Sequence, residues 1–264
     1  MDLKIAGKTA YISGGAHGIG AAITARLSDE GVRVAVSDYD GAALEANAGS
    51  WKSAGNPILV EADLSTATGV DSALSEVERG LGAVPDIVVN NVGMCISRDL
   101  LDIDDAAWDL TFQLNFMSYV RTIRAFGPRM AARGNTSIIN IASDLAKQPD
   151  DVPADYGAMK SAVLYLTKAA SKKFAPATRV NAVLPGPVWT GLWSRPGGIA
   201  DKLAELYDTD RETAVDRYLE DRQLTLGIAD PDDVATIVAY LASPLAKRIS
   251  GSAYDVGGTI QGLY

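Results

Sequence analysis

The sequence predicts a single-domain α/β protein built on a doubly wound parallel sheet. Short runs rich in β-branched residues alternate regularly with longer helical segments along the 264 residues, and parallel strands need such crossover connections. A hydrophobic content of 47% is enough for one large core. A glycine-rich turn follows the first strand, and in such sheets ligands bind outside the carboxyl ends of the strands.

The expected strands are short apolar runs, most of them rich in valine and isoleucine. In chain order they are Thr9–Ser13, Val32–Ser37, Pro57–Ala62, Pro85–Asn90, Ser137–Ala142, Arg179–Leu184 and Ser252–Val256. The expected helices lie between them, over about Gly20–Glu30, Gly41–Gly55, Ala67–Gly80, Asp104–Arg133, Ala154–Phe174 and Pro231–Ala242. These crossovers should cover both faces of the sheet with helices.

One stretch departs from this alternation. Residues 185–226 are rich in proline, glycine, tryptophan and charge, with helical character near Ile199–Tyr207 and Arg211–Gln223. Long insertions in compact domains are often functional. We therefore expect a helical substrate lid over about residues 187–226, within one catalytic domain of residues 1–264.

Composition narrows the classes of function. A net charge of −9 disfavours nucleic acid and anionic membranes as partners, and no apolar run reaches the roughly 18 residues of a membrane span. The first residues lack the apolar stretch of a secretory signal, which favours a cytoplasmic location. Because Cys95 and His17 are single, an internal disulfide and a metal site built from several histidines are excluded. The expected ligand is a small molecule, and no metal is expected.

The turn after the first strand favours an anionic ligand. Gly14, Gly18 and Gly20 let the backbone turn tightly and approach a ligand, and the N-terminus of the following helix attracts a pyrophosphate. The spacing Gly-x3-Gly-x-Gly differs from the Gly-x-Gly-x2-Gly dinucleotide fingerprint, and an ordinary strand-to-helix turn is the alternative. Asp38, 18 positions after Gly20, is either a ribose-binding carboxylate or simply part of a turn ending at Gly41.

Tyr156 and Lys160 stand four residues apart in a helical segment, so they project from one face. A free tyrosine has a pKa of about 10 and is a poor base at neutral pH, whereas a neighbouring ammonium group, with a second cation from a bound ligand nearby, favours its phenolate. We therefore expect Lys160, together with such a ligand, to lower the pKa of Tyr156 and make it a proton-transfer group. Tyr165 and Lys168, in the same segment, show that a comparable pair also arises by chance.

Taken together, a set of motifs resembles the short-chain dehydrogenase/reductase family. They are Gly14-x3-Gly18-x-Gly20, Asn90-Asn-Val-Gly93, Asn115, Ser143, Tyr156-x3-Lys160, Pro185-Gly-Pro-Val-Trp-Thr190 and Ile249-Ser-Gly-Ser-Ala-Tyr-Asp-Val-Gly-Gly258. The resemblance spans nearly the whole chain. It implies a Rossmann-like domain, a nicotinamide cofactor and often a homotetramer.

The resemblance also implies roles for individual residues. Tyr156 would be the acid/base, Ser143 would hold the substrate oxygen, Lys160 would bind the cofactor ribose and tune Tyr156, and Asn115 would support a water relay. The implied cofactor contacts are Gly14, His17, Gly18, Ile19, Gly20, Asp38, Asp63, Leu64, Asn90, Tyr156, Lys160, Val188 and Thr190. The expected substrate contacts are Ser143, Tyr156, Trp189 and Trp193, the tryptophans forming an apolar wall or only packing.

Two positions depart from the family pattern. Val92 stands where alanine is usual, which adds two carbons beside the expected adenosine path. We expect this change to be tolerated. The segment from Asp144 to Asp155 is acidic and contains two prolines. It shapes the substrate pocket or is a solvated charged loop.

The leading hypothesis is an NAD-dependent dehydrogenase that transfers hydride between a secondary alcohol, or its ketone, and nicotinamide. Asp38 favours NAD, because a carboxylate there repels the 2′-phosphate of NADP and no Arg or Lys flanks it. The first alternative is an NADPH-dependent 3-oxoacyl-thioester reductase. The second is a nucleotide-binding sensor or scaffold without turnover, which the complete set of Asn115, Ser143, Tyr156 and Lys160 disfavours.

Overall fold

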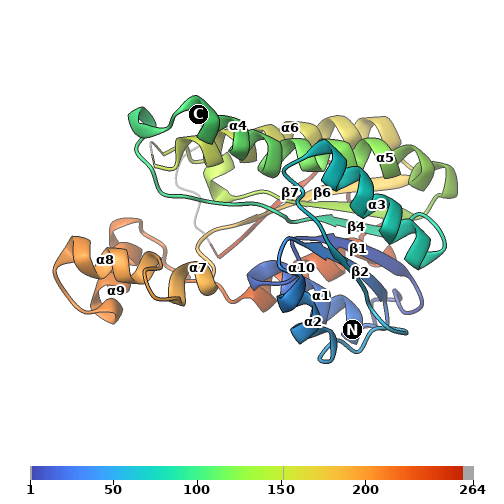
Figure 1. Cartoon of the computed structure of the whole chain (residues 1–264), viewed down its shortest axis with the longest axis horizontal. Coiled ribbons are helices and arrows are strands. Elements are labelled where there is room, and N and C mark those ends of the chain that lie inside the picture. The colour runs from blue at the N-terminus through green and yellow to red at the C-terminus, as the bar shows by residue number, and fades with distance from the viewer. Residues whose placement is uncertain (1, 151, 258–264) are drawn as a thin grey trace.

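The computed structural model describes residues 2–150 and 152–257, which form an α/β domain (Figure 1). Within these residues a seven-stranded parallel sheet has the order β3-β2-β1-β4-β5-β6-β7. The strands are β1 (Thr9–Ser13), β2 (Arg33–Asp38), β3 (Ile58–Glu61), β4 (Ile87–Asn90), β5 (Thr136–Ile141), β6 (Thr178–Pro185) and β7 (Ala253–Val256). The predicted doubly wound, Rossmann-like sheet is confirmed.

Helices cover both faces of the sheet (Figure 1). On one face lie α1 (Gly18–Asp29), α2 (Gly41–Ala48) and α10 (Pro231–Ala242). On the other lie α3 (Ala67–Leu81), α5 (Ser118–Arg133) and α6 (Ala154–Phe174). Because the central strands β1, β4, β5 and β6 are buried from both sides, their sequences do not alternate strictly between apolar and polar residues.

Two buried apolar clusters join these layers. Successive strand residues point to opposite faces, so Ile12 packs with Ile23 of α1 and Val238 of α10, whereas Tyr11 packs on the other face. The ring of Tyr11 meets Phe126 of α5 edge-on, with ring centroids 6.2 Å apart. This packing fixes the strand ends that carry the site.

The expected helix over Gly41–Gly55 ends early, at Ala48. The chain then turns so that Trp51, only 7% exposed, enters the cluster around α1. Gly55 adopts a φ of +98°, outside the helical region. The chain therefore leaves the helix after Ala48 and buries the Trp51 indole, where the local sequence predicts further helical turns.

The expected helix over Asp104–Arg133 is divided. After α4 (Asp105–Phe112) comes a π-helical segment, Gln113–Met117, and then α5. The Ser118 N–H donates to the Gln113 carbonyl, five residues back, instead of to Leu114. Such π segments are frequent at functional sites, and Asn115 lies inside this one.

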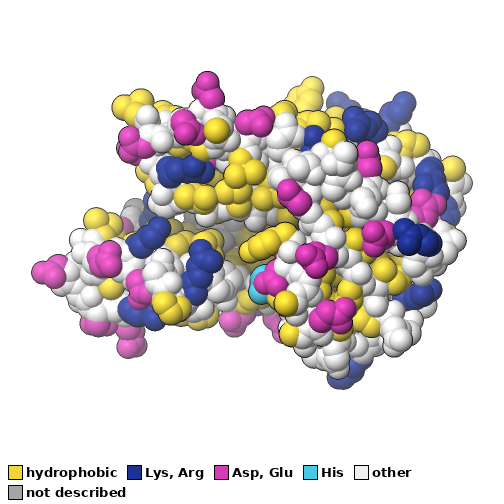
Figure 2. Space-filling model, viewed as in Figure 1, with side chains coloured by type: hydrophobic (Ala, Val, Ile, Leu, Met, Phe, Trp, Pro, Cys, Tyr) yellow, Lys and Arg dark blue, Asp and Glu magenta, His cyan; other side chains and the backbone are white. Residues whose placement is uncertain are grey.

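The helical insertion, residues 187–226, contains α7 (Gly191–Ser194), α8 (Ile199–Tyr207) and α9 (Arg211–Asp221). It projects from the body of the molecule (Figure 1) and has its own small core around Trp193, Leu203 and Ala214. Its ends meet, because a parallel bridge pairs Val188 with Ala229. On the face shown in Figure 2, the surface is hollowed between the helical insertion and the body.

Two sequence features fall partly outside the described residues. Asp151 belongs to the acidic loop between Asp144 and Asp155, and Gly258 ends the closing motif; neither is described. Of the helices in residues 2–150 and 152–257, none is both long and apolar enough to cross a membrane.

Candidate active site

The candidate site lies along the carboxyl edge of the sheet, where a parallel α/β fold binds ligands. Ser13, Asp38 and Asn90 end β1, β2 and β4, and Ser143 follows β5. We call the carboxyl ends of β1, β2 and β4 the nucleotide half of the site. The ends of β5 and β6, with the helical insertion, form the other half.

The glycine-rich turn has no room for side chains. A Cβ on Gly20 would lie 2.0 Å from the Gly14 carbonyl oxygen, and a Cβ on Gly14, whose φ is +67°, would lie 2.7 Å from the Cα of Val92. Asn91 holds the turn, because its amide donates to the carbonyls of Ser13 (3.1 Å) and Gly14 (2.7 Å). The backbone of Val92 thus lies directly against Gly14.

The N-terminus of α1 fits an anion. The side chain of its N-cap residue, His17, turns to Asp40 (2.9 Å) instead of capping the helix, so the first N–H groups keep their capacity to bind a ligand. Thr190 approaches from the other side, since a Cβ on Gly18 would lie 3.2 Å from its Cγ2. This cradle, which side chains would fill, fits the pyrophosphate of a dinucleotide.

Asp38 is buried, only 6% exposed, at the end of β2. Its Oδ2 accepts from the Ala16 N–H (3.0 Å) and its Oδ1 from the Asp40 N–H (3.2 Å). The carboxylate therefore shapes the glycine-rich turn and also places negative charge where a ribose would lie. Each of its oxygens keeps a further lone pair for a hydroxyl donor.

The other predicted cofactor residues have mixed environments. Asn90 is fully buried; its amide nitrogen donates to Asn140 Oδ1 (2.8 Å), while its own Oδ1 has no hydrogen-bond partner among the described residues. Asp63 is exposed and accepts from the N–H and hydroxyl of Ser65. Leu64 and Val188 are buried in the apolar clusters on opposite faces of the sheet, and Ile19 is partly buried against the α1 cluster.

Lys160, Asn115 and Gly93 lie side by side. The Lys160 ammonium group donates to the Ile141 carbonyl (2.8 Å) and to the Tyr119 hydroxyl (3.3 Å). The Asn115 amide exchanges two hydrogen bonds with the Met94 backbone, at 2.8 and 2.7 Å. A Cβ on Gly93 would lie 3.3 Å from Asn115 Oδ1 and 3.5 Å from Lys160 Nζ. The π segment thus fixes the loop after β4 against the lysine.

Burial dominates the acid–base properties of the pair predicted on α6. Lys160 Nζ lies 5.5 Å from the centroid of the Tyr156 ring. Burial raises the pKa of Tyr156 well above its ordinary value, although its hydrogen bond with Ser143 opposes this. Burial also lowers the pKa of Lys160 to about 7. The lowering of the Tyr156 pKa that we expected from Lys160 is therefore absent in the protein alone, and Tyr156 is a neutral phenol.

Ser143 does not stand free. Its hydroxyl donates to Asp144 Oδ1 (2.9 Å), and the Leu145 N–H donates to both side chains. Burial raises the pKa of Asp144, while the bonds from Ser143 and Leu145 and the charge of Arg222 oppose the shift. Asp144 was not among the residues predicted for the site, because adjacency in sequence does not reveal the direction of a side chain.

The two predicted tryptophans differ. Trp193 is 4% exposed and packs inside the helical insertion, 5.4 Å from the ring of Tyr218. It presents almost no surface to a substrate, which corrects the expectation that it lines the pocket. Trp189 is 43% exposed and stays available as a wall residue.

An ion pair connects the helical insertion to the acidic loop. Arg222, at the end of α9, approaches Asp150 at 2.6 Å and lies over the ring of Tyr218. Cys95 lies in the same region, because its thiol and Asp144 both act on the pKa of Tyr156. Sequence reasoning did not name Asn91, Tyr119, Asp144 or Arg222 as site residues. Asn91 lies inside a quoted motif, and Asp144 opens the acidic segment considered for the substrate pocket; Tyr119 and Arg222 carried no sequence signal.

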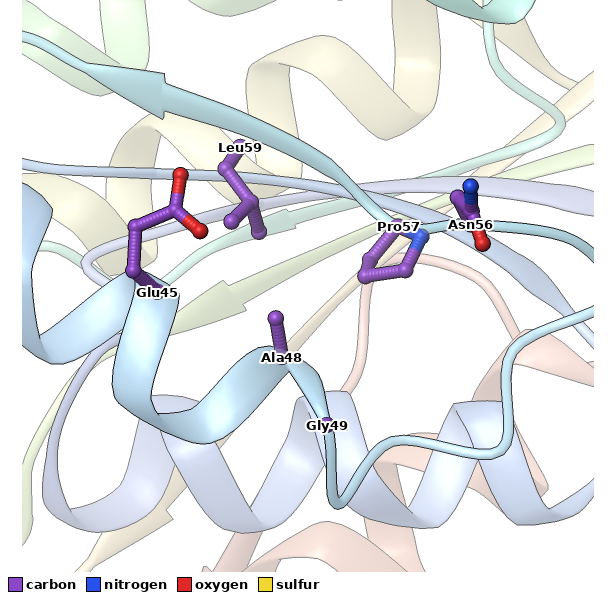
Figure 3. Close-up of a pocket in the computed structure, with 6 residues that line it drawn as sticks. All are labelled: Glu45, Ala48, Gly49, Asn56, Pro57 and Leu59. Atoms are coloured by element: carbon purple, nitrogen blue, oxygen red, sulfur yellow. The ribbon is translucent and has the colours of Figure 1, made fainter.

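A separate hollow of about 510 Å³ lies between α2 and the edge strand β3 (Figure 3). It is lined by Glu45, Ala48, Gly49, Asn56, Pro57 and Leu59. Glu45 is the one ionisable side chain among these lining residues. This hollow is not the catalytic site, since Tyr156 and Ser143 lie across the sheet beyond β4.

The fold and this edge of the sheet define a dinucleotide-binding oxidoreductase. Residues 14–259 match the family described as enoyl-(acyl carrier protein) reductase. The chain belongs to the short-chain dehydrogenase/reductase family, as the sequence motifs predict. As a member, it is an NAD(P)-dependent oxidoreductase of alcohol or ketone substrates.

Three relatives illustrate the similarity. The oxidoreductase YvrD of Bacillus subtilis (strain 168) is 33% identical over 269 residues, covering 100% of both chains. The structure of L-sorbose reductase from Gluconobacter frateurii, complexed with NADPH and L-sorbose, aligns with a TM-score of 0.92 at 30% identity over 100% of both chains. The 3-ketoacyl-(acyl-carrier-protein) reductase of Brucella melitensis, complexed with NADH, aligns with a TM-score of 0.83 at 29% identity, covering 98% of this chain and 100% of that one.

Proposed function

We propose that the protein is an NAD-dependent dehydrogenase that interconverts a secondary alcohol and its ketone, with Tyr156 as the acid/base. The observation that carries this proposal is the grouping of Tyr156, Ser143 and Lys160 at the sheet edge that also forms the glycine cradle. A dinucleotide in the cradle would extend along the carboxyl edge toward these side chains. Asn115, Ser143, Tyr156 and Lys160 act together, and the helical insertion serves as the substrate lid.

The chain's own groups manage the proton and the substrate oxygen. A nicotinamide ring, when bound, supplies or accepts the hydride at the substrate carbon. Tyr156 is a neutral phenol because of its raised pKa, so its hydroxyl donates a proton to the oxygen of a ketone. The Ser143 hydroxyl holds the same oxygen. Lys160, with a pKa lowered to about 7, gains or loses a proton readily at neutral pH beside the Tyr119 hydroxyl.

Replacement of Tyr156 tests the catalytic role. Tyr156→Phe removes the proton donor and little volume, so turnover should fall by about 10²-fold or more with folding and cofactor binding retained. Steady-state kinetics, thermal unfolding and cofactor titration measure these three properties. Tyr165→Phe, at an 81% exposed position of the same helix, is the matched control. Near-normal turnover of Tyr156→Phe would refute the catalytic role of Tyr156.

The preference for NAD rests on the charges at the end of β2. Asp38 and Asp40 are both acidic, and the imidazole of His17 lies 2.9 Å from Asp40 Oδ2. A 2′-phosphate would be repelled there, whereas ribose hydroxyls would donate to Asp38. The structures of the relatives contain NADPH in one case and NADH in the other, so the local charges decide our choice.

Competing kinetics with both cofactors test this preference. Wild-type kcat/KM should favour NAD by about 10-fold or more. Asp38→Asn combined with Tyr39→Arg should reverse or largely erase it, because the amide keeps an acceptor for the Ala16 N–H while the guanidinium binds a phosphate. Asp38→Ala combined with Tyr39→Arg should also loosen the glycine-rich turn, because alanine has no acceptor for the Ala16 N–H. Tyr39→Ala, at a 76% exposed position, should keep the wild-type preference. Equal or better wild-type efficiency with NADP would refute it.

A 3-oxoacyl-thioester reductase is the second candidate. It is favoured by the matched family description and by the Brucella melitensis reductase. Turnover of an acetoacetyl thioester with NADPH, exceeding turnover of simple ketones, would establish it instead. The family resemblance also leads us to expect a cytoplasmic homotetramer, and light scattering measures whether four chains associate.

A further inference from the structure

The Ser143 hydroxyl has only one proton, and that proton is already used. Ser143 Oγ lies 2.9 Å from Asp144 Oδ1, and an ionised carboxylate only accepts hydrogen bonds. The Leu145 N–H donates to the same two atoms, at 3.2 Å to Oγ and 2.9 Å to Oδ1. Because Leu145 is the donor in both contacts, it does not offer the Ser143 proton another acceptor. A substrate oxygen that needs the Ser143 proton must therefore displace a charge-assisted hydrogen bond.

Asp144 faces the substrate pocket. Its charge acts on Tyr156 and Cys95 within the site and on Tyr218 and Arg222 of the helical insertion. The side chain is only partly buried. The hydrogen bonds that Ser143 and Leu145 donate to this carboxylate both go to Oδ1. The carboxylate therefore keeps acceptor capacity close to the groups of the acidic loop and the insertion on which its charge acts.

We propose that Asp144 selects substrates with a hydroxyl group on the carbon next to the reacting carbon. This inference rests on the proposed function. Oxygens on adjacent carbons lie about one hydrogen-bond length apart, which matches the 2.9 Å between Ser143 Oγ and Asp144 Oδ1. When the reacting oxygen meets Ser143 and Tyr156, the neighbouring hydroxyl falls on Asp144 and donates to it. The Ser143 hydroxyl is then free to donate its hydrogen bond to the reacting oxygen, while the substrate hydroxyl replaces it as the donor to Asp144.

The exchange defines a substrate class. An α-hydroxy ketone, or a vicinal diol in the reverse direction, carries its own donor for Asp144. A plain ketone and a 3-oxoacyl thioester carry a CH₂ or CH₃ group there, so the Ser143 hydroxyl stays hydrogen-bonded to Asp144. A substrate with a carboxylate on the adjacent carbon is repelled. Asp144 acts through Ser143 on the reacting oxygen and is in that respect a positioning residue.

Matched substrate pairs test the inference in the full-length protein. The pairs are 3-hydroxybutan-2-one with butan-2-one, 2-hydroxycyclohexanone with cyclohexanone and, for oxidation, butane-2,3-diol with butan-2-ol. Wild-type kcat/KM should favour the hydroxylated member by about 10- to 100-fold. Asp144→Ala should reduce this ratio to about 3-fold or less and raise kcat/KM for the plain ketone, because Ser143 is freed.

Two further variants keep the test sharp. Asp150→Asn neutralises a carboxylate in the same loop while leaving an acceptor for Arg222, and it should retain the wild-type ratio. Asp144→Asn should lower the ratio and serves if Asp144→Ala fails to fold, which circular dichroism and thermal unfolding reveal. Equal wild-type kcat/KM for both members of each pair, or a ratio that survives in both Asp144 variants, would overturn the inference.

The failure of the proposed function gives a different result. In that case neither member of any pair would be reduced or oxidised, and Tyr156→Phe would match the wild type in every assay. Turnover of both members at equal efficiency, abolished by Tyr156→Phe, would uphold the dehydrogenase and reject the role of Asp144.

Discussion

Replacing Lys160 by methionine should make the protein more stable, because the lysine is held in a site that opposes its charge. Lys160 is 2% exposed, and burial lowers its pKa from 10.5 to about 7. That difference corresponds to about 5 kcal/mol lost when the ammonium form is kept in the fold. Methionine gives up the bonds to Ile141 and Tyr119, about 1 kcal/mol each. The Ile141 carbonyl still accepts from the Tyr119 hydroxyl at 3.1 Å. We expect a net gain of about 3 kcal/mol below pH 7.

This gain should disappear at alkaline pH. Between about pH 7 and 10.5 the unfolded wild type keeps the Lys160 proton and the native state does not. Wild-type stability therefore rises with pH in that window, by about 1.4 kcal/mol per pH unit. The difference between Lys160→Met and the wild type should thus shrink to near zero by pH 9.

Urea unfolding at pH 6.5 and pH 9 measures both effects. Lys172→Met, at an exposed position of the same helix, is the matched control and should show no pH-dependent difference from the wild type. The reasoning fails if Lys160→Met is less stable than the wild type at pH 6.5. It also fails if the two differ by the same amount at both pH values.

Two other expectations concern the first turn of α6 and the helical insertion. Asp155→Ala should cost about 3 kcal/mol in unfolding free energy, because Asp155 is 2% exposed and its loss leaves the Arg98 guanidinium without a carboxylate 3.5 Å away; the exposed Asp71→Ala is the control, and an equal effect of the two would count against it. Cofactor and substrate together should slow thermolysin cleavage within the helical insertion, and Arg222→Ala should weaken that protection, because Arg222 pairs with Asp150. Equal cutting with and without ligands would argue against a lid.

Sequence patterns predict the elements whose ends are set locally. The bounds of α6, α8 and α10 agree with expectation; α10, for example, begins at Pro231 after the capping residue Asp230. The π segment could not be foreseen, because Gln113–Met117 is compatible with an ordinary helix. Its form accompanies bonds from Asn115 to Met94, 21 residues away in sequence. Such contacts leave no local signature.

The same distinction applies to the candidate site. Residue types and spacing predict Tyr156 with Lys160, and the structure places Lys160 Nζ over the Tyr156 ring. Spacing does not reveal how deeply the two are buried, and burial decides both pKa shifts. Spacing also does not reveal that the Ser143 hydroxyl donates its hydrogen bond to Asp144. Both properties depend on which segments pack around the sheet edge.

The closed ends of the helical insertion make it an exchangeable module. The Trp189 N–H donates to the Ala229 carbonyl (2.9 Å) and the Ala229 N–H to the Pro187 carbonyl (3.0 Å), so the chain leaves and re-enters the body at one point. Lengthening or replacing the residues between them adds little loop-closure entropy and leaves the sheet register unchanged. An engineer could therefore graft a different insertion between Val188 and Ala229, and alter which molecules reach Tyr156, without redesigning the nucleotide half of the protein.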